Sequence, residues 1–234
     1  MSLAIINREL GQLADSRIAA GSQRFFKTGP GEYGEGDRFR GIRVPVLRKL
    51  AKAHQDLTLA EATELLHSSY HEDRLLALLI LGNAALKGDD ALRESIYHLY
   101  LENTQFVNNW DLVDSSAEQI VGAFLTNRDR QVLAQLARSN SLWERRIAII
   151  ATFHFIKRAD FRDTLSLAEM LLSDSEDLIH KAVGWMLREV GNRNQGVAEE
   201  FLAHHYQQMP RVMLRYAIEK YPEPKRKQYL RGEV

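Results

Sequence analysis

Two long apolar runs, set among amphipathic stretches, constrain the fold of this chain most strongly. Residues 75–81 are Leu-Leu-Ala-Leu-Leu-Ile-Leu, and residues 147–153 are Ile-Ala-Ile-Ile-Ala-Thr-Phe. A helix that is apolar on every side must be covered on every side, so both runs predict inner helices. Amphipathic stretches such as 165–172 and 197–206 provide covering helices. No useful length of sequence alternates apolar and polar residues, so the predicted fold class is all-α.

The helical stretches recur along the chain. Clusters of Gly, Asn, Asp and Ser, which favour helix caps and turns, separate them at residues 87–90, 126–129, 139–141 and 191–194. Ala148 stands 71 positions after Ala77 and 34 positions before Ala182, in similar sequence contexts. This spacing predicts a two-helix repeat of about 35 residues. Stacked repeats curve, so we expect one repeat domain over residues 1–234 whose inner helices line a concave surface.

Residues 28–37 depart from this pattern, with four glycines and one proline among ten residues. Basic and aromatic residues flank them, as Arg-Phe-Phe-Lys at 24–27 and Arg-Phe-Arg-Gly at 38–41. The composition predicts a long loop at 27–41 between the first two helices, which either contacts nucleic acid or is a flexible connector. The loop lacks GK[ST] and a preceding strand, which argues against a nucleotide site. Pro45 suits the first turn of the following helix.

Charge is balanced overall but segregated along the sequence. Basic residues outnumber acidic ones by eight to three in residues 24–54 and again in 128–162. Residues 56–103 show the reverse, three against nine, and residues 222–234 are expected to form a basic C-terminal tail. This pattern permits a basic face opposite an acidic face; the alternative is ordinary solvated helix surface.

Composition excludes several classes of protein. No apolar run reaches the roughly 18 residues of a membrane span, and residues 1–10 lack the apolar core of a signal peptide. The absence of cysteine excludes disulfides, iron–sulfur clusters and thiolate zinc sites. His67 and His71, four residues apart, lack the glutamate and third ligand of a zinc motif. We expect a cytoplasmic, monomeric protein with no metal and no small-molecule cofactor.

All three tryptophans have charged neighbours. Trp110 and Asp114 are four residues apart, so the ring and the carboxylate lie on one helix face. An aromatic face attracts cations, and the pair therefore suits a site for a flat or cationic group. A tryptophan in a helix more often belongs to the core, which we expect for Trp143. The polar neighbours of Trp110 instead predict a cleft or surface position.

Three segments in this order and spacing, residues 109–114, 143–148 and 181–189, resemble the AlkD-type DNA glycosylases. These are bacterial DNA alkylation repair enzymes with a HEAT-like repeat fold, and the resemblance runs from about Gly41 to about Tyr221. It implies a basic concave cleft that holds double-stranded DNA containing alkylated bases. It also implies removal of cationic purines such as 3-methyladenine and 7-methylguanine, in the bacterial cytosol or nucleoid.

The resemblance assigns roles to individual residues. The catalytic aspartate falls on Asp114, the two cleft tryptophans on Trp110 and Trp185, and the cleft arginine on Arg146 or its neighbour Arg145. An aromatic residue near the first loop is also implied, and Phe25, Phe26 or Tyr33 can fill that role. The glycine-rich insertion departs from the family and leaves the substrate range open. The residues expected to contact DNA are Arg145, Arg188, Lys181, Arg43, Arg40, Tyr33 and Phe26.

The implied chemistry suits these residues. A cationic purine is already a good leaving group, and its departure builds positive charge on the deoxyribose. The Asp114 carboxylate can stabilise that charge and position the attacking water. Trp110 and Trp185 favour a cationic base by roughly 0.5–2 kcal/mol each. Arg146 pairs either with Asp114 or with a phosphate. The resemblance implies that the base stays exposed rather than entering a protein pocket.

Three functions remain open from the sequence. The first is a monofunctional glycosylase for alkylated bases, since no lysine lies beside Asp114 for lyase chemistry. The second is a non-catalytic member of the same fold that binds branched or distorted DNA. The third is a protein–protein scaffold, which predicts no salt-dependent affinity for DNA.

Overall fold

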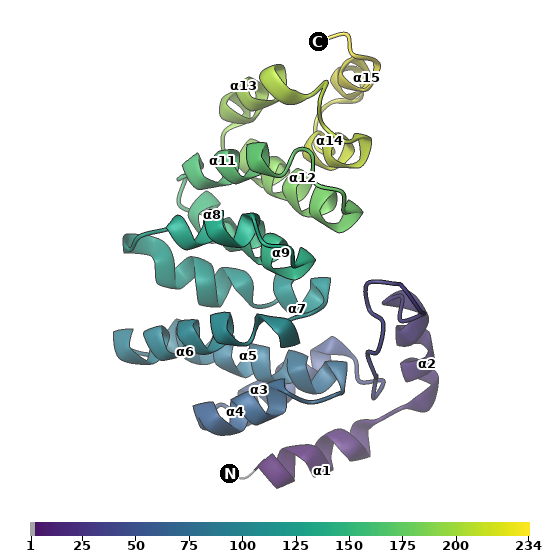
Figure 1. Ribbon diagram of the computed structural model, residues 1–234, viewed down its shortest axis with the longest axis vertical. Coiled ribbons are helices and arrows are strands. Elements are labelled where there is room, and N and C mark those ends of the chain that lie inside the picture. Colours follow the sequence, from purple (N-terminus) through teal and green to yellow (C-terminus); the bar gives the residue numbers. More distant parts are fainter. Residues whose placement is uncertain (1–2) are drawn as a thin grey trace. The chain divides into compact units, whose positions relative to one another are not determined.

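The computed structural model describes residues 3–234 and confirms the all-helical fold (Figure 1). Within these residues the only extended pairing is an isolated bridge between Arg38 and Tyr70. No helix in this range is both long enough and apolar enough to cross a membrane. Two compact units are present, the first ending at Phe124 and the second being Leu125–Val234. Helical repeats contact only their neighbours and divide readily in this way, so a single domain over residues 1–234 stays a prediction.

The first unit is built around helix α5 (His71–Lys87), which contains the first apolar run. Helices α3, α4 and α6 and the π-helical turn η2 all pack against α5. Residues 75–81 are buried throughout, as predicted for an inner helix. The other elements of this unit are α1 (Leu3–Leu13), α2 (Ser16–Phe25), α3 (Val44–Ala53), α4 (Leu59–Leu66), α6 (Asp90–Glu102), η1 (Thr104–Phe106), α7 (Trp110–Asp114) and η2 (Glu118–Gly122).

Local sequence sets where these helices begin. The Asp15 carboxylate caps α2 by accepting a hydrogen bond from the Arg17 N–H at 2.8 Å. Thr58 and Glu61 form a capping box at the start of α4. Pro45 lies in the first turn of α3, as predicted, where its missing N–H leaves no partner unsatisfied.

The second unit is built around α12 (Asp177–Gly191), which packs against α9, α11, α13 and α14. Its second inner helix, α9 (Leu142–Ala151), contains most of the second apolar run, and residues 147–152 are buried as predicted. The remaining elements are η3 (Leu125–Asn127), α8 (Gln131–Ala137), α10 (Phe153–Ile156), α11 (Arg162–Met170), α13 (Gln195–His205), α14 (Arg211–Ala217) and α15 (Glu223–Arg231).

Two predictions about the second unit are corrected. The basic segment 222–234 is not a tail but contains helix α15, whose Tyr229 is buried edge-on against Tyr206 at 5.5 Å. The Tyr206 hydroxyl also donates a hydrogen bond to the Val234 carbonyl at 2.7 Å. Trp143, expected in the core, is only partly buried. Its helix turns other residues inward, namely the apolar run that begins at Ile147.

Helices α12 and α14 approach closely because Gly184 has no side chain. A Cβ at this position would lie 2.4 Å from the Met213 carbonyl oxygen and 2.6 Å from the Tyr216 Cβ. We expect Gly184→Ala to lower the free energy of unfolding by about 2 kcal/mol, because the backbone of α14 must move.

The matched control is Gly11→Ala in α1, where a Cβ would meet no atom within 4 Å. Alanine has the higher helix propensity, so this control should raise the free energy of unfolding by about 0.5–1 kcal/mol. Chemical denaturation of both variants measures the difference. Equal effects of the two substitutions would contradict close packing at Gly184.

Candidate functional site

Helix α7 presents Trp110 and Asp114 one turn apart on the same face, as the sequence predicts. The Asn109 side chain caps this helix by accepting a hydrogen bond from the Trp110 N–H at 2.8 Å. Leu112 and Val113 turn into the core and are fully buried. Trp110 and Asp114 are only partly buried, which agrees with a surface or cleft position for Trp110.

An aromatic cluster surrounds the Trp110 ring. Phe26 stacks on Trp110 with ring centroids 5.4 Å apart, and Phe25 meets its edge at 5.9 Å. Phe39 stacks on Phe26 in turn, at 5.2 Å. Phe25 is 65% exposed, the most exposed of the large apolar side chains described. Two of the three candidates for the aromatic position near the first loop, Phe25 and Phe26, therefore contact Trp110.

The glycine-rich loop lies between α2 and α3, not between the first two helices as predicted, because the first helical stretch is divided in two at residues 14–15. Its end is fixed by the buried Glu72 carboxylate, which accepts hydrogen bonds from the N–H groups of Arg40, Gly41 and Ile42 at 2.8, 2.7 and 3.2 Å. Gly41 has φ +84°, and a Cβ there would lie 2.0 Å from the Asp15 carbonyl oxygen.

Buried charges fix the middle of the loop as well. Asp37 accepts hydrogen bonds from Arg74 at 2.6 Å and from His71 Nδ1 at 3.2 Å. His71 Nε2 lies 2.8 Å from Asp111 on α7, so this imidazole joins the loop to the helix that holds Trp110. The loop is thus packed in place and is not a flexible connector. Its contact with nucleic acid stays a prediction.

His71 is charged at neutral pH. Burial lowers its pKa, but the hydrogen bonds and charges of Asp111 and Asp37 outweigh burial and raise the pKa to about 9. Burial likewise opposes ionisation of Asp37, yet His71 and Arg74 hold the pKa of that carboxyl below its usual value. Sequence reasoning missed Asp37, His71 and Asp111. The sequence feature that indicates this network is the run of four charged or polar residues, 71–74, directly before the apolar run of α5.

A mostly apolar cavity of about 380 Å³ lies beside this network, between α2, the loop, α3 and α5. Phe26, Phe39 and Leu75 line it, and Asp111 borders it. Asp111 Oδ1 is buried with no hydrogen-bond partner, whereas Oδ2 is held by His71. Among residues 3–234, no group of three or more His, Asp or Glu side chains is arranged to hold a metal ion.

The second unit holds the other predicted catalytic residues. Arg146 is buried in α9, and its guanidinium donates a hydrogen bond to the Leu178 carbonyl at 2.5 Å. Trp185 is partly buried on α12, and its ring lies 5.8 Å from that of Phe153. Arg145 pairs with Asp174 at 2.6 Å. Arg145 therefore has a carboxylate partner within its own unit.

The residues predicted to contact DNA differ in burial and in whether an acidic side chain already holds them. Arg40 is held by both oxygens of Asp73, at 2.6 and 2.8 Å, and stacks on Tyr70. Arg43 is exposed at the start of α3, and Tyr33 is partly buried in the loop. In the second unit, Lys181 pairs with Asp177 at 2.7 Å, and Arg188 pairs with Glu219.

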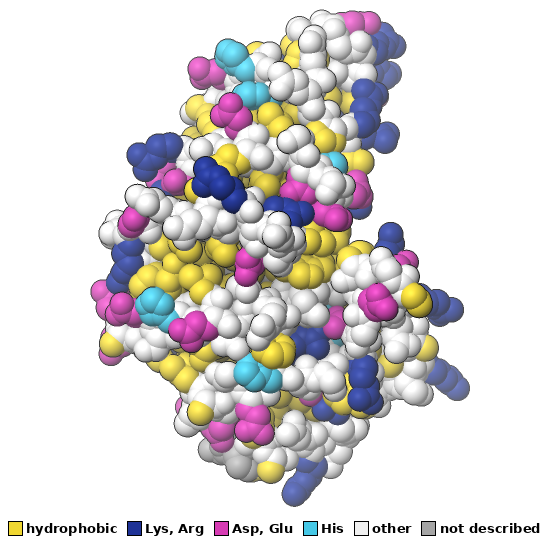
Figure 2. Space-filling view, in the orientation of Figure 1, with side chains coloured by type: hydrophobic (Ala, Val, Ile, Leu, Met, Phe, Trp, Pro, Cys, Tyr) yellow, Lys and Arg dark blue, Asp and Glu magenta, His cyan; other side chains and the backbone are white. Residues whose placement is uncertain are grey.

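Basic side chains gather over α14 and α15 in the second unit, where Figure 2 shows Lys and Arg along one edge. Five of the seven basic residues from 211 onward are exposed, namely Arg211, Arg215, Lys220, Lys227 and Arg231. The basic residues that cluster toward the C-terminal end of the sequence therefore form a basic surface on this unit.

The charge on His71 predicts how the stability of the folded protein depends on pH. The folded-state pKa of His71, about 9, lies above the ordinary value of 6.5. The charged imidazole therefore stabilises the folded protein fully below pH 6.5, and this stabilisation is lost as pH rises through about 9. We expect His71→Gln to lose on the order of 3 kcal/mol of unfolding free energy at pH 6 and to remove this pH-dependent fall.

Urea denaturation from pH 6 to pH 10 measures this effect. The control is His98→Gln, an exposed histidine on α6, which should keep the fall seen in the wild type. A wild-type and a His71→Gln protein with parallel pH profiles would contradict a charged His71 in the folded state.

Comparison with known proteins adds to this geometry. A family model described as DNA alkylation repair enzyme matches residues 6–221. No curated protein sequence matches the chain. A structure described as a predicted DNA alkylation repair enzyme from Enterococcus faecalis is 15% identical, with a TM-score of 0.68, covering 90% of this chain and 97% of that one. AlkD2 from Streptococcus mutans is 13% identical, with a TM-score of 0.54, covering 88% and 98%.

At these identities the two structures establish the helical fold and nothing about activity. The family model is the stronger finding, because residues 6–221 take in nearly all of both compact units. It also confirms the resemblance seen in the three tryptophan-bearing segments. The chain therefore belongs to the DNA alkylation repair enzyme family.

Proposed function

We propose that this protein is a monofunctional DNA glycosylase that hydrolyses the N-glycosidic bond of cationic alkylated purines. The observation that carries the proposal is the Trp110–Asp114 pair on α7, held at the surface by a capped helix with a buried opposite face. In a family of DNA alkylation repair enzymes, an aromatic ring beside a carboxylate matches the charge of an alkylated base.

The aromatic cluster favours binding of the damaged nucleotide. Trp110 offers its ring to a cation, and Phe26 fixes that ring from one side by stacking at 5.4 Å. A ring held in one orientation loses less conformational entropy when a ligand binds. The cation–π attraction of roughly 0.5–2 kcal/mol then discriminates between a charged base and a neutral one.

Asp114 performs the chemical step in this proposal. Departure of the cationic purine leaves positive charge on the deoxyribose, and the partly buried Asp114 carboxylate on α7 stabilises that charge. The same carboxylate orients the attacking water. The reaction needs no metal and no cofactor, because the leaving group is already charged.

The second unit supplies further DNA contacts. Trp185 contributes a second aromatic face, and the buried Arg146 guanidinium provides a fixed positive charge. Contacts with the DNA backbone or sugar come from Arg43, Lys181, Arg188, the loop residue Tyr33, and Phe26 at the end of α2. Asp73 and Asp174 already hold Arg40 and Arg145. These two arginines therefore contact DNA only through N–H groups that the carboxylates do not occupy.

Base release from a duplex containing one 7-methylguanine tests the proposal. We expect the wild type to release the base and Asp114→Asn to be slower by about 100-fold or more, because one preorganised charge is lost from the transition state. DNA affinity, measured in the same samples, should be kept. The control is Asp56→Asn, an exposed carboxylate in the turn before α4, which should release the base normally. Tight binding without release by the wild type would instead identify a non-catalytic DNA binder.

Phe25 provides an independent test of DNA contact by this surface. We expect Phe25→Ala to weaken binding of damaged duplex about tenfold, because stacking of an exposed ring on a base contributes about 1–3 kcal/mol. Fluorescence anisotropy measures the affinity. Leu86→Ala is the matched control, since Leu86 is also exposed, at 56%, but lies near the end of α5. Equal affinities of the two variants for DNA would show that DNA binds to another surface of the protein.

A further inference from the structure

The apolar cavity beside the Trp110 cluster has no role in the function proposed above. It lies within the first unit, between α2, the glycine-rich loop, α3 and α5, and has a volume of about 380 Å³. Pockets that bind small molecules span roughly 300–1,000 Å³ and are mostly apolar and aromatic, with a few polar groups that orient the ligand. The cavity matches this description in volume and in the character of its walls.

Aromatic rings form one wall of the cavity. Phe26, Phe39 and His71 line it, and their three rings contact one another with centroids 5.2, 4.9 and 4.7 Å apart. Phe26 also stacks on Trp110 at 5.4 Å, so the cavity is one ring away from the candidate site. Phe39 comes from the glycine-rich loop, the segment that departs from the AlkD-type enzymes. Rings fixed in this way favour a flat aromatic ligand, because stacking adds to the burial of its surface.

One carboxylate oxygen at the cavity lacks a partner. Asp111 lines the cavity, and His71 holds its Oδ2 at 2.8 Å, whereas its Oδ1 is buried without a hydrogen bond. The carboxylate of Glu72, which also lines the cavity, is already bonded to three backbone N–H groups. Buried polar atoms in folded proteins are nearly always satisfied. Asp111 Oδ1 therefore indicates a ligand that brings an N–H donor.

The cavity opens to the surface along α2. Its outer side is formed by residues 43–45, which are exposed. A neighbouring hollow of about 410 Å³ shares Ile18 and Ser22 with the cavity and extends to the exposed ring of Phe25. The two hollows therefore adjoin, and a flat group at Phe25 lies at the entrance to the cavity.

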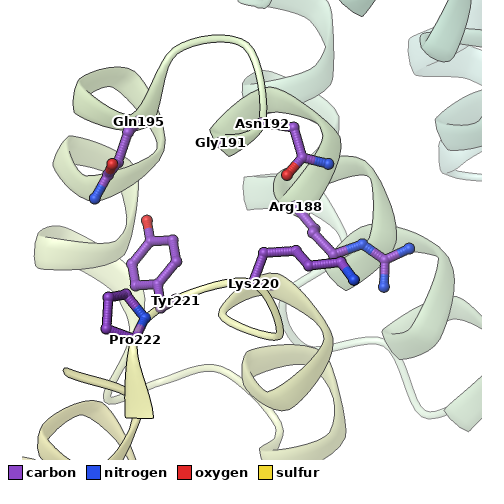
Figure 3. A pocket seen from close by; sticks show the side chains of 8 residues that line it. Arg188, Gly191, Asn192, Gln195, Lys220, Tyr221 and Pro222 are labelled. Carbon is purple, nitrogen blue, oxygen red and sulfur yellow. The ribbon is translucent and has the colours of Figure 1, made fainter. Parts of the chain in front are cut away.

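A smaller pocket in the second unit offers no comparable site (Figure 3). It measures about 200 Å³ and lies where the turn after α12 faces the segment between α14 and α15. Figure 3 shows the Tyr221 hydroxyl turned toward Gln195 and away from the ends of Lys220 and Arg188. The polar groups of this pocket do not converge on one ligand, so the cavity of the first unit is the better site for a small molecule.

We infer that the cavity of the first unit binds the purine base of the damaged nucleotide. An alkylated purine is flat and aromatic, and its amino group can donate to Asp111 Oδ1 while its ring stacks on the aromatic wall. The inference rests on the proposed function for the identity of the ligand. It differs from the exposed base that the resemblance implies, because the nucleotide must rotate out of the duplex to place its base here.

Binding of free 7-methylguanine to the full chain, measured by isothermal titration calorimetry, tests the cavity without catalysis. Ser22→Leu places a larger apolar side chain in the cavity lining. We expect it to weaken binding of the base about tenfold or more, the usual effect of a group that intrudes into a pocket of fixed shape. The matched control is Gln23→Leu, the exposed neighbour outside the lining, which should keep the wild-type affinity.

Caffeine tests the role of Asp111 on the wild-type protein. It is a methylated purine of similar size that has no N–H group. We expect caffeine to bind about tenfold more weakly than 7-methylguanine, because it brings no donor for Asp111 Oδ1. Equal affinities for the two purines would overturn recognition of the base by Asp111.

Base release from a duplex containing one 7-methylguanine tests whether the base of the nucleotide enters the cavity. Ser22→Leu should slow release about tenfold and keep the affinity for undamaged duplex, because only the damaged base needs the cavity. Normal release by this variant would overturn the inference, as would free 7-methylguanine that fails to bind or binds both proteins equally. Absence of release by the wild type would contradict the proposed function instead, and the free-base titrations would still decide whether the cavity binds the purine.

Discussion

The structure of the first unit depends on the charged residues that begin α5. His71, Glu72, Asp73 and Arg74 are consecutive, and all are buried. Charged side chains are stable in a protein interior only when each has an ion-pair or hydrogen-bond partner. Here the partners lie in the glycine-rich loop and at its end, on α7 and in the turn before α5. Removing one partner of a buried pair costs about 3–5 kcal/mol, so this cluster determines where the loop and α7 can lie.

This constraint reaches the candidate site through two routes. The first is polar, because Asp111 on α7 is hydrogen-bonded to His71. The second is aromatic, because Phe26 contacts both the His71 ring at 4.9 Å and the Trp110 ring at 5.4 Å. Trp110 and Asp114 are therefore presented by a helix of only five residues that is fixed at its start from two sides. A site of this kind is preorganised, which reduces the entropy lost when a ligand binds.

The sequence predicts those features that depend on neighbouring residues. The apolar runs give the inner helices α5 and α9, and the relation of Trp110 to Asp114 follows from helical spacing alone. The pairing of Asp37 with His71 joins residues 34 positions apart, and no local pattern encodes it. Helix α15 was missed for a different reason. Its sequence is mostly charged and polar, and its place in the fold depends on the single buried ring of Tyr229.

In the proposed function, the two units offer DNA different kinds of contact. The first unit presents aromatic rings and a carboxylate, which the proposal assigns to the damaged base and its sugar. The second unit presents a basic surface over α14 and α15, which in this proposal suits the phosphate backbone whatever the base. A chain with 31 basic and 31 acidic residues has no general attraction for DNA. The proposed affinity for DNA therefore depends on local groups of exposed cations, such as those on α14 and α15.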